Sequence, residues 1–479
     1  MTVTCSTGLL RMPASVVTVL AAFLLATLVL LPATTDAAGS KGLTRGSLVQ
    51  KAGKSGCVVD RSTPKQGCAI ARAIEGPGPF MGSHAIALSP NGAHVYVASS
   101  GSNAIAVFSR NRKTGNLTQA KGKAGCVSLK GSFGCARAVG LKGPNSIALS
   151  PDGGYLYATS RDSSSVTAFR RNRTTGRLTQ LASGSGCVSS LPLPGCASGR
   201  ALAGADVVAV SPDGTNVYVG AFLGNAVAVF DRDPSTGALT QPADETGCIT
   251  EAPTSGCSQG IALSSPEGLA VNGDGTNVYV ASATSNAVLT FNRDTTTGAL
   301  TQADDGTGCI AQSPLTGCST GFELSGANAV ALSPDDQDVY VTSLISSSLT
   351  SFKRGAAGAL GQIPGAGGCV AWLKQPPCTP GRALRAPEGL AVSPDGRNIY
   401  VTAFSSGGIA VMNRFRPTGT VVQKPGRDGC VTVQSIANCN VGRALAGVSS
   451  IALSPDGRFA YATANKSNAI AVFRRVTGN

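Results

Sequence analysis

The segment APEGLAVSPDGRNIYVTA (residues 386–403) decides the fold, because the chain repeats it. Laid over itself, the sequence shows this phrase seven times, and the second position of its Ser-Pro-Asp-Gly turn falls on Pro90, Pro151, Pro212, Gly273, Pro334, Pro394 and Pro455. The spacings are 61, 61, 61, 61, 60 and 61 residues. Periods of this size are typical of closed or stacked repeat architectures. We therefore expect one structural unit in spite of the length of 479 residues.

Each repeat contains four short apolar runs. In the second repeat they are SIALS (146–150), YLYATS (155–160), SVTAFRR (165–171) and RLTQ (177–180). The runs alternate or are β-branched, and Gly, Asn, Asp and Ser bound them, which is the signature of strands. A unit of about 60 residues with four antiparallel strands is typical of a propeller blade. The sequence thus predicts an all-β, seven-bladed β-propeller of four-stranded blades.

The two ends of the chain complement each other. The last repeat stops after three strands, at NAIAVFRRVTGN (468–479). The segment GSLVQKAGKSGC (46–57) matches the fourth-strand phrase GALTQPADETGC (237–248). We predict that the N-terminal strand completes blade seven in a 3+1 closure, because this arrangement removes two open sheet edges.

Aromatic residues recur in register. One second-strand position carries Tyr96, Tyr157, Tyr218, Tyr279, Tyr340, Tyr400 and Tyr461. One third-strand position carries Phe108, Phe169, Phe230, Phe291, Phe352, Met412 and Phe473. We expect these side chains to pack between neighbouring sheets. The turn aspartates, such as Asp152 and Asp395, are expected to bond their own backbone.

Fourteen of the fifteen cysteines form seven pairs, one in each repeat. We predict seven disulfides within the blades: Cys57–Cys68, Cys126–Cys135, Cys187–Cys196, Cys248–Cys257, Cys309–Cys318, Cys369–Cys378 and Cys430–Cys439. Zinc is the alternative, but two cysteines without a nearby histidine supply only half of a tetrahedral site. Disulfides on this scale need an oxidising compartment.

The N-terminus has the pattern of a secretory signal. Arg11 precedes an apolar run from Val16 to Leu31, and Thr35 and Ala37 suit a small-residue cleavage site. We expect a signal peptide over residues 1–37 and one propeller domain over 38–479, secreted or at the cell surface. A retained membrane anchor is the alternative, because the run is only slightly shorter than a membrane span.

Basic residues gather in the connection between the third and fourth strands, as in SRNRKTG (109–115) and NRFRPTG (413–419). The net charge is +14, and removing residues 1–37 leaves it unchanged because one Arg and one Asp leave together. A basic rim on one face favours acidic partners such as anionic cell-wall polymers, whereas the alternative is a role in solubility alone. The loops lack interleaved aromatics, so we expect no specific nucleic-acid binding.

A polar residue precedes each turn by six positions: His84, Asn145, Asp206, Glu267, Asn328, Glu388 and Ser449. If the first strand is innermost, these side chains form a ring at one end of the central channel. Three carboxylates held together would raise at least one pKa, and a divalent cation relieves that conflict. Calcium prefers such oxygen ligands. We expect Asp206, Glu267 and Glu388 to hold Ca²⁺ or another divalent cation, with Asn145 and Asn328.

The phrases GPNSIALSPDG (143–153), SPEGLAVNGDG (265–275) and APEGLAVSPDG (386–396) resemble those of calcium-dependent gluconolactonases. In that family, acidic and Asn side chains at this position hold the metal that polarises the lactone. The longer pattern over residues 149–180 is more similar to seven-bladed lactonases and YVTN surface-layer propellers, and this similarity runs through all seven repeats. The gluconolactonases have six blades, so a seven-bladed ring is wider.

Few other residues suggest chemistry. The chain has two histidines, His84 and His94, and lacks the HExxH and GxSxG motifs. His84 is a candidate base in the ring, with a hydrogen-bonded bystander as the alternative. Three arginines, Arg200, Arg382 and Arg443, follow their disulfide loops and could attract a substrate carboxylate, or else bind loop carbonyls.

Two functions remain open from the sequence. The one we favour at this stage is a secreted, disulfide-braced binding scaffold, expected to be a monomer, whose varied loops contact an acidic polymer or an extracellular protein. The alternative is a lactonase-like hydrolase of a small lactone, in which the ring cation polarises the carbonyl and Glu388 or His84 serves as general base.

Overall fold

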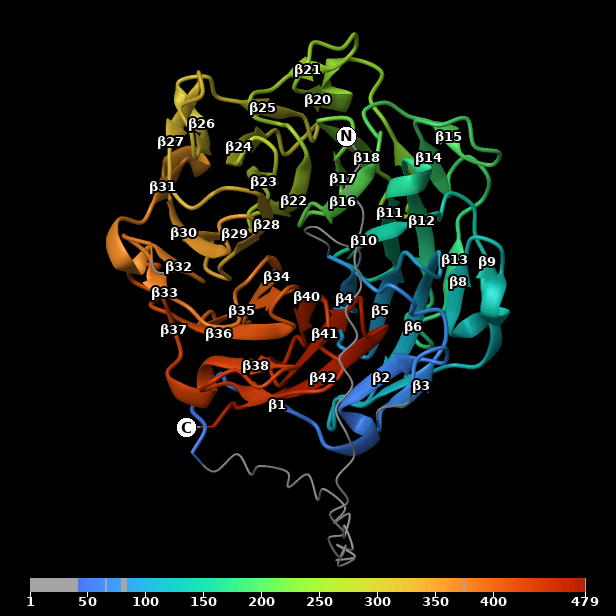
Figure 1. The fold of residues 1–479 in the computed structure, drawn as a ribbon. Coiled ribbons are helices and arrows are strands. Elements are labelled where there is room, and N and C mark those ends of the chain that lie inside the picture. Colours follow the sequence, from blue (N-terminus) through green and yellow to red (C-terminus); the bar gives the residue numbers. More distant parts are fainter. Residues whose placement is uncertain (1–41, 65–66, 79–83, 374, 479) are drawn as a thin grey trace, which may run out of the picture. The chain divides into compact units, whose positions relative to one another are not determined.

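The computed structural model describes residues 42–64, 67–78, 84–373 and 375–478. These residues form seven sheets, each of which is one blade of a propeller (Figure 1). The expected signal segment 1–37 lies outside the described residues. The described part of the chain contains no helix with the length and hydropathy of a membrane span.

The first three strands of every blade follow the predicted phrases. The innermost strands are β4 (Ile86–Leu88), β10 (Pro144–Leu149), β16 (Ala205–Val210), β22 (Pro266–Val271), β28 (Ala327–Leu332), β34 (Pro387–Val392) and β40 (Val448–Leu453). The second strands are β5 (His94–Ser99), β11 (Tyr155–Ser160), β17 (Asn216–Ala221), β23 (Asn277–Ser282), β29 (Asp338–Ser343), β35 (Asn398–Ala403) and β41 (Phe459–Ala464). The third strands are β6 (Ala104–Arg110), β12 (Ser165–Arg171), β18 (Ala226–Arg232), β24 (Ala287–Arg293), β30 (Ser348–Arg354), β36 (Gly408–Arg414) and β42 (Ala469–Arg475).

Three further strands complete each sheet. The fourth strands are β7 (Leu117–Gln119), β13 (Leu178–Gln180), β19 (Leu239–Thr240), β25 (Leu300–Gln302), β31 (Leu360–Gln362), β37 (Val421–Gln423) and β1 (Leu48–Gln50). The cysteine strands are β8 (Cys126–Ser128), β14 (Cys187–Ser189), β20 (Cys248–Thr250), β26 (Gly306–Ala311), β32 (Cys369–Ala371), β38 (Cys430–Thr432) and β2 (Cys57–Asp60). The outermost strands are β9 (Ala136–Arg137), β15 (Ala197–Ser198), β21 (Ser258–Gln259), β27 (Cys318–Thr320), β33 (Thr379–Pro380), β39 (Asn440–Val441) and β3 (Ala69–Ala71).

The blades therefore have six strands where the sequence predicted four. In blade 2 the expected fourth strand divides, because β13 pairs with one end of β12 and β14 pairs with the other. Residues 182–185 loop out between them, and the amide of Gln180 donates to the carbonyl of Gly186 at 2.9 Å across the loop. The disulfide Cys187–Cys196 then returns the chain alongside β14, so β15 runs parallel to it.

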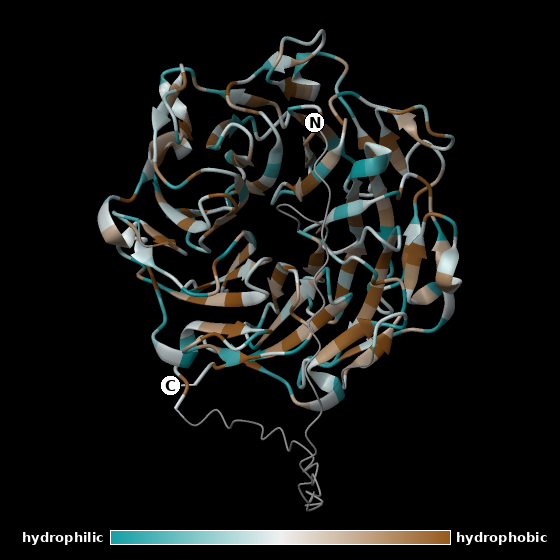
Figure 2. Cartoon of the chain, in the orientation of Figure 1, coloured by the Kyte–Doolittle hydropathy of each residue, from teal (hydrophilic) through white to brown (hydrophobic). Residues whose placement is uncertain are grey.

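Helical structure in the described residues is limited to 3-10 turns. These are η1 (Gly53–Ser55), η2 (Gly122–Ala124), η3 (Ser132–Gly134), η4 (Arg161–Ser163), η5 (Glu245–Gly247), η6 (Ala356–Gly358), η7 (Gly365–Gly367) and η8 (Gly426–Gly429). All seven predicted disulfides are present among the described residues, with Cα–Cα distances between 4.5 and 4.9 Å. The hydrophobic residues concentrate on the strands of the sheets (Figure 2).

Both ends of the chain meet in one sheet. The N-terminal strands β1 and β2 pair antiparallel with β42, and β3 pairs with β2. Neighbouring innermost strands contact one another in a cycle from β4 through β10, β16, β22, β28, β34 and β40 back to β4. The propeller ring is thus continuous, and the innermost strands surround its axis.

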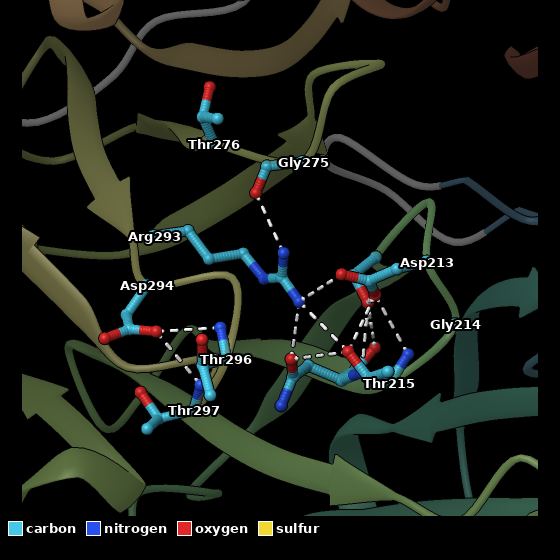
Figure 3. Close-up of polar contacts among 12 residues, drawn as sticks. Asp213, Gly214, Thr215, Gly275, Thr276, Arg293, Asp294, Thr296 and Thr297 are labelled. Atoms are coloured by element: carbon cyan, nitrogen blue, oxygen red, sulfur yellow. Dashed lines mark hydrogen bonds and ion pairs between the residues drawn. The ribbon is translucent and has the colours of Figure 1, made fainter.

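An arginine–tyrosine contact joins each blade to the one before it. In blade 4, the guanidinium of Arg293 donates from Nε to the Tyr218 hydroxyl at 2.7 Å and from Nη1 to the Gly275 carbonyl at 2.9 Å. It also forms an ion pair with Asp213 at 2.8 Å (Figure 3). The Tyr218 hydroxyl in turn donates to the carbonyl of Gly298 at 2.9 Å.

This contact recurs around the ring. The Arg-to-Tyr bonds are Arg110–Tyr461, Arg171–Tyr96, Arg232–Tyr157, Arg293–Tyr218, Arg354–Tyr279, Arg414–Tyr340 and Arg475–Tyr400. The tyrosines pack as predicted, and their hydroxyls add polar bonds that sequence patterning alone did not indicate. The turn aspartates bond their own backbone, as Asp395 does with the Arg397 amide at 3.3 Å, and several also pair with the arginine of the next blade.

Candidate functional site

The predicted ring residues occupy one structural position. Asn145, Asp206, Glu267, Asn328, Glu388 and Ser449 are each the second residue of an innermost strand, and His84 lies just before β4. In six blades the register between the first and second strands shifts at this residue. Bulges of this kind re-aim a side chain away from the ladder.

Hydrogen bonds link the ring residues of neighbouring blades. The Asn145 amide donates to the backbone carbonyl of Asp206 at 3.1 Å, and the Asn328 amide donates to the carbonyl of Pro387 at 2.9 Å. The Ser449 hydroxyl donates to the carbonyl of Gly78 at 3.0 Å. The first two of these bonds connect adjacent innermost strands.

This ring contains three buried carboxyl groups. Asp206, Glu267 and Glu388 are at most 2% exposed. Burial raises the pKa of Asp206 to about 7, although the nearby Arg161 guanidinium pulls it down. Burial, followed by the charges of Asp206 and Glu388, raises the pKa of Glu267 to about 9. At pH 8 the Asp206 carboxyl is therefore mainly ionised, whereas the Glu267 carboxyl is mainly protonated.

Arg161 joins this site from a loop that the sequence reasoning did not select. It begins η4, between the second and third strands of blade 2. Its guanidinium lies 3.8 Å from Asp206 Oδ1 and 3.8 Å from the centre of the Phe222 ring, and its side chain is 29% exposed. No hydrogen bond reaches either carboxylate oxygen of Asp206 from the described residues. Arg161 thus connects the buried carboxylates with the solvent side of the ring.

The signal for Arg161 was available in the repeats but weak. The matching first loop position holds Ser100, Arg161, Phe222, Ala283, Leu344, Phe404 and Asn465. Only a comparison of this loop position across the blades singles out the arginine, and the sequence does not place it beside Asp206.

The fit of the ring to a divalent cation is incomplete. Among the described residues, no three His, Cys, Asp or Glu side chains come close enough to hold a metal ion. The Asn328 amide is engaged on both sides, because its oxygen accepts from the Thr342 hydroxyl at 2.9 Å. Asn145 is the better candidate ligand for a metal ion, since its side-chain oxygen has no hydrogen bond to described residues. A calcium site stays a prediction, and no reaction step below depends on it.

The remaining candidates have simpler surroundings. Burial lowers the pKa of His84, so its imidazole is neutral at pH 7. The guanidinium of Arg200 donates to the carbonyls of Pro242, Ala243 and Asp244. Arg382 and Arg443 bond carbonyls of the next blade in the same way. These bonds agree with the alternative expectation that the three arginines bind loop carbonyls. A substrate contact by the arginines stays a prediction.

The basic rim is smaller than the sequence indicated. The last arginine of the third strand is buried in six blades, at Arg110, Arg171, Arg232, Arg293, Arg414 and Arg475. These guanidinium groups are used in the contacts between blades, so part of the apparent rim charge belongs to the interior. The exposed remainder includes Arg112, Arg397 and Arg416.

The fold and the ring define a seven-bladed β-propeller with a buried acidic cluster at one end of its innermost strands. Two segments, residues 70–190 and 187–311, match the model of the family described as "Lactonase, 7-bladed beta-propeller". Together they cover half of the sequence, and the chain belongs to this family.

One relative is similar to a short part of the chain. A 6-phosphogluconolactonase of Bacillus subtilis (strain 168) is 32% identical over 112 residues, which are 23% of this chain and 27% of that protein. The match thus spans about a quarter of the relative. Among solved structures, the periplasmic gluconolactonase of Pseudomonas aeruginosa is similar with a TM-score of 0.52 and 19% identity, over 84% of this chain and 96% of that one.

Another solved structure separates fold from activity. The hydrazine synthase of Kuenenia stuttgartiensis is similar with a TM-score of 0.51 and 17% identity, over 84% of this chain and 98% of that one. At such identities the likeness concerns the fold alone. The argument for a function therefore has to come from the site.

Proposed function

We propose that the ring face hydrolyses a lactone. The observation that carries the proposal is the pair of buried carboxyl groups, Asp206 and Glu267, whose pKa values of about 7 and about 9 are separated by their surroundings. Two titratable groups with separated pKa values are the usual arrangement of a general base and a general acid. Membership of the lactonase propeller family favours a lactone as the substrate class.

The chemistry follows from these protonation states. Near pH 8, ionised Asp206 takes a proton from a water molecule as its oxygen attacks the lactone carbonyl carbon. Arg161, 3.8 Å from Asp206, stabilises the negative charge that develops on the carbonyl oxygen. As the ring C–O bond breaks, neutral Glu267 donates its proton to the leaving oxygen. A proton then passes from Asp206 to Glu267 through water, and the product is a hydroxy acid.

This proposal assigns roles that differ from the sequence-based ones. There, Glu388 or His84 was the candidate base and a cation polarised the carbonyl. Here Glu388 acts on Glu267 through its charge, which raises the pKa of that acid. The preference also moves from binding to hydrolysis, because Asp206 is now available as the base, Glu267 as the acid and the Arg161 guanidinium as the positive charge.

The test uses purified, oxidised residues 38–479 and a pH-indicator assay with glucono-δ-lactone and simple γ- and δ-lactones. We expect hydrolysis above the spontaneous rate, with a bell-shaped pH dependence whose limbs lie near pH 7 and pH 9. Asp206→Asn should abolish it. Asp305→Asn, which changes an exposed aspartate bonded to Thr307, is the matched control. Unchanged hydrolysis in Asp206→Asn would refute the assignment.

A second candidate is recognition of an extracellular partner. Leu223 and Ile345 are 67% and 69% exposed, and both lie in loops between second and third strands on the ring face. Exposed apolar side chains on loops of a rigid scaffold favour contact with another molecule. We infer that the protein acts in an oxidising compartment, secreted or at the cell surface, because it carries a disulfide in every blade.

A further inference from the structure

A concave site lies on the face opposite the ring. It is a pocket of about 400 Å³ in blade 6, lined among others by Arg45, Arg397, Phe415 and Arg416. Arg397 belongs to the turn between the first two strands, and Phe415 and Arg416 follow the third strand. The volume is within the range of small-molecule sites.

Phe415 occupies a position that four other blades use to hold their turn. The matching residues are Asn111, Asn172, Asp233 and Asp294 in blades 1 to 4, whereas blades 5 and 7 carry Gly355 and Val476. Asp294, for example, accepts the backbone N–H groups of Thr296 at 2.8 Å and Thr297 at 3.0 Å (Figure 3). A phenylalanine makes no such bonds.

The turn in blade 6 keeps its backbone form without that side chain. The Gly419 N–H donates to the Phe415 carbonyl at 2.8 Å, as the Gly298 N–H does to the Asp294 carbonyl. The Phe415 side chain is 50% exposed. Blade 6 therefore lacks the two side-chain hydrogen bonds that Asp294 makes, and it is the one blade that places an aromatic side chain, half exposed, at this position. A departure from local structural rules without a structural gain is expected at functional positions.

The pocket also has an excess of positive charge. Arg397 makes no side-chain hydrogen bond or ion pair with described residues, and the side chain of Arg416 bonds only the backbone carbonyl of Asp395. Arg45 pairs with the Asp395 carboxylate at 3.1 Å, but Arg475 already holds that carboxylate at 2.8 and 2.9 Å. Arg397 and Arg416 are thus left as exposed cations beside the Phe415 ring.

We propose that this pocket binds a small organic anion made of a planar ring and a phosphate or carboxylate group. The guanidinium groups of Arg397 and Arg416 bond the anionic group, since their planar donors match such oxygens. The ring of the ligand packs on Phe415. The site is separate from the ring carboxylates, so the proposal does not depend on lactone hydrolysis.

Calorimetric titration of oxidised residues 38–479 with phenyl phosphate, inorganic phosphate and benzoate tests this site. We expect phenyl phosphate to bind roughly threefold to tenfold more tightly than inorganic phosphate because of the ring contact. Arg397→Ala and Arg416→Ala should each weaken phenyl phosphate roughly tenfold. Comparison with benzoate then tells whether the anionic group that the site prefers is a phosphate or a carboxylate.

The decisive variant is Phe415→Asn, which restores the residue of blades 1 and 2 at this turn. It should melt at or above the wild-type temperature and bind phenyl phosphate no more tightly than inorganic phosphate. The matched control is Arg173→Ala, which removes the corresponding arginine of blade 2, paired with Asp152 at 2.6 Å. It should leave binding unchanged.

Three results would overturn the proposal. One is the same preference for phenyl phosphate in Phe415→Asn as in wild type, and another is an equal loss in Arg173→Ala and Arg416→Ala. The third is a wild-type protein that binds none of the three probes. Binding of long polyphosphate that is indifferent to all four variants, without a preference for phenyl phosphate, would assign the face to general charge attraction.

Discussion

Replacing Asp206 by asparagine should make the stability of the folded protein less sensitive to a rise in pH even as it removes activity. Asp206 is fully buried, and burial raises its pKa to about 7, whereas an aspartate in the unfolded chain titrates at about 3.9. The neutral carboxyl stabilises the folded state fully below about pH 3.9, and this contribution is lost as the pH rises to 7. Asparagine cannot ionise, so the variant does not lose it.

The size of the effect follows from the shift. A difference of about three pKa units corresponds to about 4 kcal/mol of unfolding free energy between pH 4 and pH 8. The propeller unit, Ser40–Asn479, has an unfolding entropy of roughly 0.9 kcal/mol/K at the usual value per residue. The difference in Tm between Asp206→Asn and wild type should therefore be roughly 4 °C more positive at pH 8 than at pH 4. This comparison is independent of how well the amide packs.

The assay is thermal melting at the two pH values, with a chelator present to remove divalent cations. The matched control is Asp338→Asn, a second fully buried aspartate. Arg414 donates to Asp338 at 2.9 Å and Lys353 lies at 2.8 Å, so breaking this pair should cost about 3 to 5 kcal/mol at pH 8. A Tm difference for Asp206→Asn that is equal at both pH values would mean that Asp206 is ionised without cost in the folded protein, and would refute the reasoning.

Three further predictions concern other parts of the fold. His94 is buried beside Arg171, and burial lowers its pKa to about 4, so wild type should lose about 3 kcal/mol as the pH falls from 6.5 to 4. His94→Asn, which copies the residue of blade 3, should remove that loss in a pH series of melting curves. Tyr461→Phe should lower the unfolding free energy by about 1 to 3 kcal/mol in thermal melting, because Arg110 and the Gly115 carbonyl both lose their partner; an unchanged Tm would refute this role. If the ring binds calcium, excess Ca²⁺ should raise the Tm over that in chelator, and Glu388→Gln should abolish the rise; a rise that persists in the variant would place the ion elsewhere.

The sequence predicted the fold because the framework positions repeat. Strand phrases, turns and cysteine pairs each recur seven times, so even the completion of the last blade by the N-terminus could be proposed from the match between residues 46–57 and 237–248. The division of the fourth strand could not be predicted, because it depends on a loop closed by Gln180 and Gly186. The site was predicted only in part, since Arg161 reaches Asp206 from a neighbouring blade. The burial of one arginine in six of the seven blades was missed because charge patterning alone does not indicate burial.

The two ends of the propeller can carry function for the same physical reason. The Tyr218 hydroxyl donates to the backbone of the next blade, Arg293 donates to the Tyr218 hydroxyl of the blade before it, and an added Cβ at Gly298 would clash with Asn216, so changes at these positions disturb two blades. A ring residue lies at a bulge, outside the ladder, and Phe415 lies in a turn that the Gly419 N–H holds through the backbone. Side chains at such positions can differ from blade to blade without breaking the repeat. The acidic ring and the Phe415 pocket are therefore where a single blade can specialise while the seven-fold framework stays constant.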